Sequence, residues 1–161
     1  MKLSALRVVQ RLPVGLPETW AFFSDPRNLE RITPPDLKFE IASDLPGQMH
    51  PGMIVVYRIR LLSRLSVDWV TEITHVREPH LFVDEQRFGP YRFWHHQHHF
   101  RALAGGTEME DIVHYALPFG AAGRIFGGPP VRRRLRDIFA FRRRFLEEAF
   151  GVFPQQAEVR P

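Results

Sequence analysis

Four histidines lie within five consecutive residues near the middle of the chain, His95-His96-Gln97-His98-His99. Side chains on a β-strand alternate between its two faces, so His96 and His98 share one face, and only two of these imidazoles can cooperate there. A carboxylate and a phenol, Asp111 and Tyr115, follow on the next predicted strand. Imidazole, carboxylate and phenol groups can transfer protons, orient a polar ligand or hold a metal ion. They are the first candidates for chemistry.

The Gly105-Gly106 pair is a strong signal for a two-residue hairpin turn. If Ala104 pairs with Thr107, Phe100 lies opposite Asp111, and His98 becomes a diagonal neighbour of Asp111. One face of the hairpin is then apolar apart from its candidate groups and is expected to face inward: Trp94, His96, His98, Phe100, Met109, Asp111 and Tyr115. The other face is mostly polar and is expected to face water; it includes His95, Gln97, His99 and His114.

Polar groups under a sheet need partners, because a buried unpaired charge is very unfavourable. One interpretation is a self-satisfied His–Asp–Tyr network that fixes the sheet, and another is a set of groups that orient the polar end of a ligand in a cavity. A third is a metal site built from His96, His98 and a carboxylate such as Asp111. The residues after His98 lack the glutamate of a cupin-type motif, so we expect no metal and no other cofactor.

Other strands supply further cavity-facing candidates by their alternation: Tyr57, Trp69, Thr71, Phe82, Asp84 and Gln86. Trp20 and Phe23 are expected to serve ordinary packing. No catalytic residue is assigned, because the chain has no Gly-x-Ser-x-Gly elbow, phosphate loop or dinucleotide fingerprint. A general acid/base pair drawn from the inward His, Asp and Tyr groups would suit an aldol cyclisation or a dehydration.

The last candidates lie on a long amphipathic helix predicted over residues 131–150. Its apolar face includes Phe139, and Arg142 falls near the middle of that face. A buried guanidinium must have an acceptor, so we expect Arg142 to pair with Asp84, with Asp111 or with the anionic head of a ligand. Snorkelling to the pocket mouth is the alternative.

Hydrophobic alternation and turn residues predict the elements that position these side chains. A first strand over residues 4–12 is followed by a short helix over 17–23 and another through Leu29 and Ile32. Strands are expected at 39–41, 54–61, 67–76, 81–86, 91–104 and 107–117, and residues 118–130 are expected to form a glycine-rich linker at the pocket rim. This order predicts an α+β helix-grip fold, in which a curved antiparallel sheet of about seven strands wraps around the C-terminal helix. We expect one domain over residues 1–151 and a tail over 152–161.

The composition is that of an ordinary globular protein: 161 residues, 44% hydrophobic and 25% charged. The absence of cysteine excludes disulfides and Cys-based zinc sites. No secretory signal or bilayer-length apolar run is evident, so a cytoplasmic protein without stable membrane insertion is expected. Seven arginines in 131–148 account for much of the net charge of +4. We interpret them as a solvated helix face and expect no nucleic-acid partner; monomer and homodimer both stay open.

Several motifs resemble bacterial SRPBCC ligand-binding proteins of the START-like superfamily. They are Asp25-Pro26, Asn28-Leu29, Ile32-Thr33-Pro34-Pro35, Phe82-Val83-Asp84-Glu85-Gln86, Gly89-Pro90-Tyr91, Trp94, His96, His98, Phe100, Asp111, Tyr115, Leu117-Pro118-Phe119-Gly120, and Ile138-Phe139 to Arg142. The resemblance covers about residues 4–150. It implies a helix-grip fold and a polyketide cyclase/dehydrase-like pocket.

Non-catalytic binding of a small hydrophobic or amphipathic ligand, such as a lipid, isoprenoid or polyketide-like compound, is the function this resemblance favours. A cyclase or dehydratase that uses the His, Asp and Tyr groups is the alternative. A partner-binding module that acts through the basic C-terminal helix is a second alternative.

Overall fold

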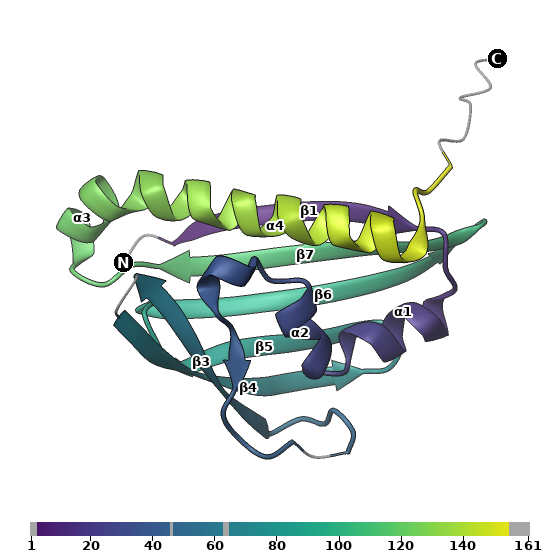
Figure 1. Cartoon of the computed structure of the whole chain (residues 1–161), viewed down its shortest axis with the longest axis horizontal. Helices are drawn as coiled ribbons and strands as arrows, with labels where there is room; N and C mark the ends of the chain where they lie inside the picture. The colour runs from purple at the N-terminus through teal and green to yellow at the C-terminus, as the bar shows by residue number, and fades with distance from the viewer. Residues whose placement is uncertain (1–2, 46, 63–64, 155–161) are drawn as a thin grey trace.

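The structure is a computed structural model that describes residues 3–45, 47–62 and 65–154. Its centre is an antiparallel seven-stranded sheet with the strand order β1-β7-β6-β5-β4-β3-β2 (Figure 1). The strands are β1 (Ser4–Leu12), β2 (Glu40–Ile41), β3 (Met53–Leu62), β4 (Leu65–Arg77), β5 (Leu81–Phe88), β6 (Phe93–Leu103) and β7 (Gly106–Ala116). The predicted helix-grip architecture is confirmed. Most of the expected C-terminal tail, 155–161, lies outside the described residues.

Two short helices, α1 (Leu16–Phe23) and α2 (Arg27–Arg31), connect β1 to β2 and are followed by a 3₁₀ turn, η1 (Pro35–Leu37). Pro17 lies in the first turn of α1, where its missing N–H breaks no hydrogen bond. The Trp20 ring packs edge-on against Phe82 on β5 and Phe100 on β6, at centroid distances of 5.9 and 5.8 Å. This aromatic contact anchors α1 to the sheet.

The β6–β7 hairpin confirms the predicted faces but corrects the predicted register. Leu103 pairs with Gly106, so the turn residues are Ala104 and Gly105, and His98 lies directly opposite Asp111 instead of diagonal to it. Gly105 has a φ of +83°, which glycine adopts freely. A Cβ on Gly106 would lie 2.0 Å from the carbonyl oxygen of Leu12. The second glycine is therefore required by the close approach of the Leu12 backbone and not by the turn.

The segment before the last helix was predicted wrongly as a linker. It forms α3 (Gly120–Ala122) and a π-helical turn, η2 (Gly123–Gly127), and then α4 (Gly128–Phe150) begins three residues before the expected start. Pro129 and Pro130 occupy the first turn of α4, where proline is tolerated because its N–H is not needed. The prediction had placed both prolines in the glycine-rich linker.

Helix α4 lies lengthwise along β1 and β7 (Figure 1). Its buried residues are spaced three or four apart: Leu135, Phe139, Arg142 and Leu146. Arg143, on the exposed side, donates a hydrogen bond to the carbonyl oxygen of Val9 on β1 at 2.8 Å, and its own carbonyl accepts one from Gln10 at 3.2 Å. Among the described residues, no helix is long and apolar enough to cross a bilayer.

Candidate functional site

A cavity of about 380 Å³ lies between the sheet, α4 and the α2–η1 segment. In Figure 1 the α2–η1 segment lies in front of the sheet, below α4. Helix α4 contributes Val131, Leu135, Ile138 and Phe139, and the α2–η1 side contributes Leu29, Ile32 and Leu37, among others. The lining is therefore mostly apolar, as ligand pockets usually are.

One part of the cavity wall is a cluster of three aromatic rings from three strands or loops. The Trp69 ring lies 5.1 Å from Trp94 and 5.5 Å from Tyr91, and Tyr91 lies 4.8 Å from Trp94. Edge-to-face and tilted pairs of this kind are favourable and rigid. The cluster gives the cavity a preformed aromatic surface next to its polar groups.

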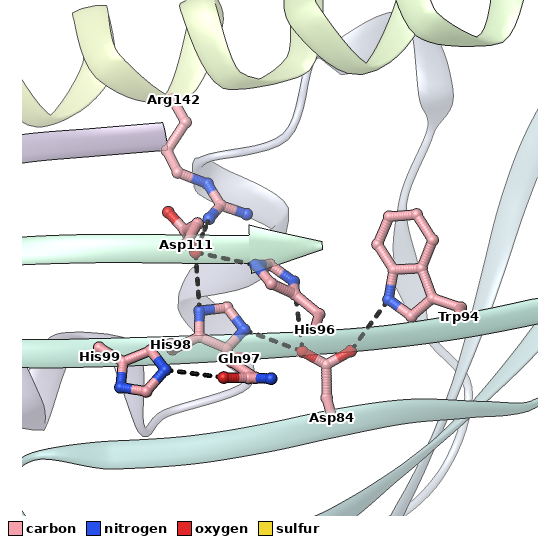
Figure 2. A network of polar contacts seen from close by, with 8 residues as sticks. All are labelled: Asp84, Trp94, His96, Gln97, His98, His99, Asp111 and Arg142. Carbon is pink, nitrogen blue, oxygen red and sulfur yellow. Dashed lines mark hydrogen bonds and ion pairs between the residues drawn. The ribbon is translucent and has the colours of Figure 1, made fainter. Parts of the chain in front are cut away.

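The polar part of the wall is a network of two carboxylates and two imidazoles that crosses three strands (Figure 2). His96 and His98 from β6 lie between Asp84 on β5 and Asp111 on β7, and their rings are 3.8 Å apart. Asp84 is 2.8 Å from His98 Nε2 and 3.4 Å from His96 Nδ1. Asp111 Oδ1 is 2.8 Å from His96 Nε2 and 3.0 Å from His98 Nδ1. Each histidine thus bridges the two carboxylates.

Exposure falls steadily from the cavity into the interior of this network. The side chain of Asp84 is 16% exposed, those of His96 and His98 are 6% and 8% exposed, and that of Asp111 is 1% exposed. Asp84 and both histidines line the cavity, whereas Asp111 lies behind them. A bound molecule would therefore meet the Asp84 side of the histidines first.

Arg142 on α4 completes the network from above, and its Nη1 donates to Asp111 Oδ1 at 3.3 Å (Figure 2). The predicted pairing of Arg142 with an inward carboxylate is confirmed. Its guanidinium also lies 4.7 Å over the Phe139 ring, a cation–π distance. Three nitrogens therefore lie within ion-pair distance of Asp111 Oδ1. Three buried atoms have no partner with hydrogen-bond geometry among the described residues: His98 Nδ1, Asp111 Oδ2 and Arg142 Nε.

Burial and neighbouring charges have opposite effects on the pKa values of several groups in this network. Burial would raise the pKa of Asp111, but Arg142 and the two histidines outweigh it and hold that pKa well below its usual range. The pKa of Asp84 is also lowered, since His96 and His98 outweigh its burial. Burial and the neighbouring His98 lower the pKa of His96. For His98 burial acts in the same direction, but hydrogen bonds to Asp111 and Asp84 overcome it and raise the pKa.

These directions define one favoured charge state. They favour the ionised form of Asp84 and Asp111, and of the two imidazoles they favour the protonated form at His98 and the neutral form at His96. With the Arg142 guanidinium, two positive charges then balance two negative ones, which is how a buried ionic cluster avoids a large desolvation penalty.

Most of the predicted site residues line the cavity: Tyr57, Trp69, Thr71, Phe82, Asp84, Trp94, His96, His98, Phe139 and Arg142. The others lie away from it: Gln86, Phe100, Met109, Asp111 and Tyr115. Phe100 and Met109 are core residues opposite each other on β6 and β7. Gln86 instead holds the β5–β6 connection, where its amide donates to the carbonyl of Tyr91 and accepts from the Tyr91 N–H.

The predicted network changes in two members. Tyr115 is buried beside Tyr91, and no hydrogen bond between described residues joins it to the histidines. Asp84 contacts both histidines instead, so the network contains two carboxylates and no tyrosine. The short turn between β6 and β7 made it possible to predict which residues lie near Asp111. The β5–β6 connection is longer, so the sequence did not predict that Asp84 pairs with His96.

Sequence reasoning missed the wall formed by the helix pair. Phe23, expected to serve packing alone, lines the cavity together with Asn28, Leu29, Thr33 and Leu37. Arg134 on α4 also lines it, and its guanidinium forms an ion pair with Asp36 on η1 at 2.6 Å. Asn28-Leu29 and Thr33 belong to motifs that carried the resemblance to ligand-binding proteins, but they had not been named as cavity residues.

No family model and no curated protein matches the chain. Solved structures do resemble it. Protein Ms6760 from Mycobacterium smegmatis is 19% identical with a TM-score of 0.63, over 92% of this chain and 98% of that one. Ara h 8.0201 is 12% identical with a TM-score of 0.61, over 91% and 99%. The di-domain ARO/CYC protein BexL from the BE-7585A biosynthetic pathway is 16% identical with a TM-score of 0.66, over 94% of this chain and 51% of that one.

At these identities the likeness shows the fold alone. A seven-stranded antiparallel sheet that holds a long C-terminal helix, with a helix pair after the first strand, defines the helix-grip class. The chain shares the helix-grip fold of these solved structures, which is the fold that its sequence motifs predicted.

Proposed function

We propose that this protein binds a small, largely apolar molecule in its cavity without transforming it, and that a polar group of the ligand lies against Asp84, His96 and His98. The observation that carries this proposal is a cavity of about 380 Å³ with an apolar lining and one concentrated set of polar groups. Pockets for small ligands typically have this size and this division of roles.

The arrangement of the wall supports an amphipathic, partly flat ligand. The rings of Trp69, Tyr91 and Trp94 offer preformed aromatic surface, and the Trp94 indole N–H is held by Asp84 at 3.3 Å. The aromatic and polar surfaces therefore adjoin at Trp94. A lipid, an isoprenoid or a polyketide-like compound with one oxygenated end suits such a wall.

The test is native mass spectrometry of gently purified protein, followed by extraction of any bound compound. Ile138 lines the cavity from α4, and Ala140, two residues further on, is exposed. We expect a stoichiometric small molecule on the wild type and on Ala140→Trp, and its loss from Ile138→Trp, which fills the cavity. Equal occupancy in all three proteins, or no compound in any, would contradict the proposal.

A second function, a cyclase or dehydratase reaction, is favoured by one specific observation. His96 and His98 stand 3.8 Å apart at the cavity wall with a carboxylate in contact with both, so that two proton-transfer groups would face the same bound molecule. The ARO/CYC protein BexL shares the fold.

The two functions separate in an assay with β-hydroxyketone and poly-β-ketone model compounds. A cyclase or dehydratase would release water from such a compound and form a new conjugated product, which mass spectrometry and absorbance detect. His96→Gln should abolish that turnover, while the matched change His99→Gln on the outer face should retain it. Binding without turnover supports the first function.

A further inference from the structure

We propose that Asp84, His96 and His98 form a binding site for one divalent transition-metal ion at the cavity wall. This goes beyond ligand binding, because it assigns the cavity an inorganic component. Among the described His, Asp and Glu side chains, these three bring one donor atom each within 4.8 Å of one another. Two imidazole nitrogens and one carboxylate oxygen suit zinc, cobalt, nickel, copper or ferrous iron better than calcium or magnesium.

The separations of the donor atoms match a shared ion. Asp84 Oδ2 is 2.8 Å from His98 Nε2 and 3.4 Å from His96 Nδ1. Two ligands that each lie about 2.1 Å from one metal are about 3.0 Å apart in an octahedral site and about 3.4 Å apart in a tetrahedral one. Asp84 Oδ2 therefore lies close to the separation of a shared ion from each histidine nitrogen, and one donor atom of each residue lies within 4.8 Å of the others.

The opposite sides of both rings support the same assignment. His96 Nε2 and His98 Nδ1, the nitrogens that face away from Asp84, lie 2.8 and 3.0 Å from Asp111 Oδ1. Histidine ligands in metalloproteins normally donate their second N–H to a carboxylate or carbonyl group, which fixes the ring and the tautomer. Asp111 supplies that acceptor for His96 and lies 3.0 Å from His98 Nδ1, and Arg142 holds Asp111 from α4 (Figure 2).

This pattern leaves an electron-rich point on the cavity side. When both N–H groups are directed at Asp111, the lone pairs of His96 Nδ1 and His98 Nε2 face the Asp84 carboxylate. In the metal-free protein the hydrogen bond between His98 Nε2 and Asp84 occupies this point, and a bound metal ion would replace it. Because all three side chains line the cavity, the remaining coordination positions would open towards water or an oxygen of a bound molecule.

The sequence led to the opposite expectation for a specific reason. A carboxylate was sought close after the histidines and on the adjacent β7 strand, where Asp111 is found. The donor that completes the set comes from β5, which precedes the histidines and pairs with β6 so that Asp84 lies opposite His96.

The experiment is a titration of chelator-treated full-length protein with Zn²⁺ and, separately, with Co²⁺. Calorimetry should give one Zn²⁺ per chain, and bound Co²⁺ should show the visible absorption of a cobalt centre with nitrogen ligands. Co²⁺ should also quench tryptophan fluorescence, since the Trp94 indole is 3.3 Å from Asp84.

Variants locate the site. Asp84→Asn should weaken Zn²⁺ binding at least 10-fold, whereas His95→Gln and His114→Gln, at a pair of outward-facing histidines with ring centroids 6.2 Å apart, should leave it unchanged. If Asp84→Asn does not fold, judged by circular dichroism, His96→Gln serves the same purpose. Sub-stoichiometric binding by the wild type, or binding that is lost in the His95 or His114 variant and kept in the Asp84 variant, would overturn the proposal.

Discussion

Asp111 is almost completely enclosed, and three nitrogens from two elements converge on one of its oxygens. Removing the one permanent cation among them strands a buried carboxylate. We expect Arg142→Met to lower the free energy of unfolding by about 3 kcal/mol. Urea denaturation measures this, with Arg144→Met on the exposed side of α4 as the matched control. A loss below about 1 kcal/mol would mean that His98 alone compensates Asp111.

A second residue-scale prediction concerns the buried tyrosines. Burial and the charge of Asp84 raise the pKa of Tyr57, and burial also raises the pKa of Tyr91. In the unfolded chain tyrosine ionises near pH 10, so above about pH 10 the unfolded state binds fewer protons than the folded state. Stability is therefore intact below that pH and falls as the pH rises, by about 1.4 kcal/mol per pH unit for each such tyrosine.

In Tyr57→Phe the free energy of unfolding should fall less steeply as the pH rises above about 10, because one buried tyrosine no longer contributes. The chain suits the measurement because it has only two lysines, so few other groups titrate in that range. Urea unfolding between pH 9 and 11.5 gives the slope. An unchanged slope in Tyr57→Phe would show that its hydroxyl ionises in the folded protein as it does in the unfolded chain.

Strand alternation was sufficient to identify the inward side chains of β6 and β7, because burying one face leaves a single choice. It could not identify Asp84 as the partner of the histidines. Contacts between β5 and β6 depend on a connection whose shape is set by Gln86 and the backbone of Tyr91, and no local residue pattern reports that pairing.

At the scale of the elements, the hairpin shows why the faces were predicted correctly and the register was not. A slip of two residues preserves the alternation, and two adjacent glycines allow either turn. In the observed register the Leu12 carbonyl of β1 leaves no room for a Cβ on Gly106, which explains why the second glycine is needed. A tertiary contact of this kind has no counterpart in the local sequence.

This contact predicts an order of stabilities. Gly106→Ala places a methyl group against fixed backbone, so β1 and β7 must separate locally, and we expect a loss of about 2–3 kcal/mol. Gly105→Ala meets no neighbour within 4 Å and costs only the strain of a positive φ, about 1 kcal/mol. Thermal or urea unfolding of the two variants checks the order. An equal loss in both would place the turn at Gly105-Gly106 after all.

At the scale of the whole molecule, the Arg134–Asp36 ion pair joins α4 to η1 beside the cavity, and both side chains are substantially exposed. Exposed pairs contribute little to stability, typically below about 1 kcal/mol. We expect Arg134→Gln to leave the unfolding free energy nearly unchanged but to speed exchange of a cavity ligand several-fold. Stopped-flow displacement of a fluorescent fatty-acid probe measures this.

Arg136→Gln, an exposed position on the same helix, is the control for that experiment. Equal exchange rates in the wild type and both variants would mean that ligands pass through another part of the wall. Faster exchange in both variants would attribute the effect to net charge instead of the ion pair.

Strand β1 lies at one end of the strand order, and open sheet edges invite the addition of a strand from another molecule. Arg143 of α4 already occupies the Val9 carbonyl of that strand, and Gln10 is held against the backbone of the same helix. A second chain would have to displace these contacts and bring its own backbone past a cationic side chain. The long helix thus covers part of this edge of the sheet, in addition to closing the cavity.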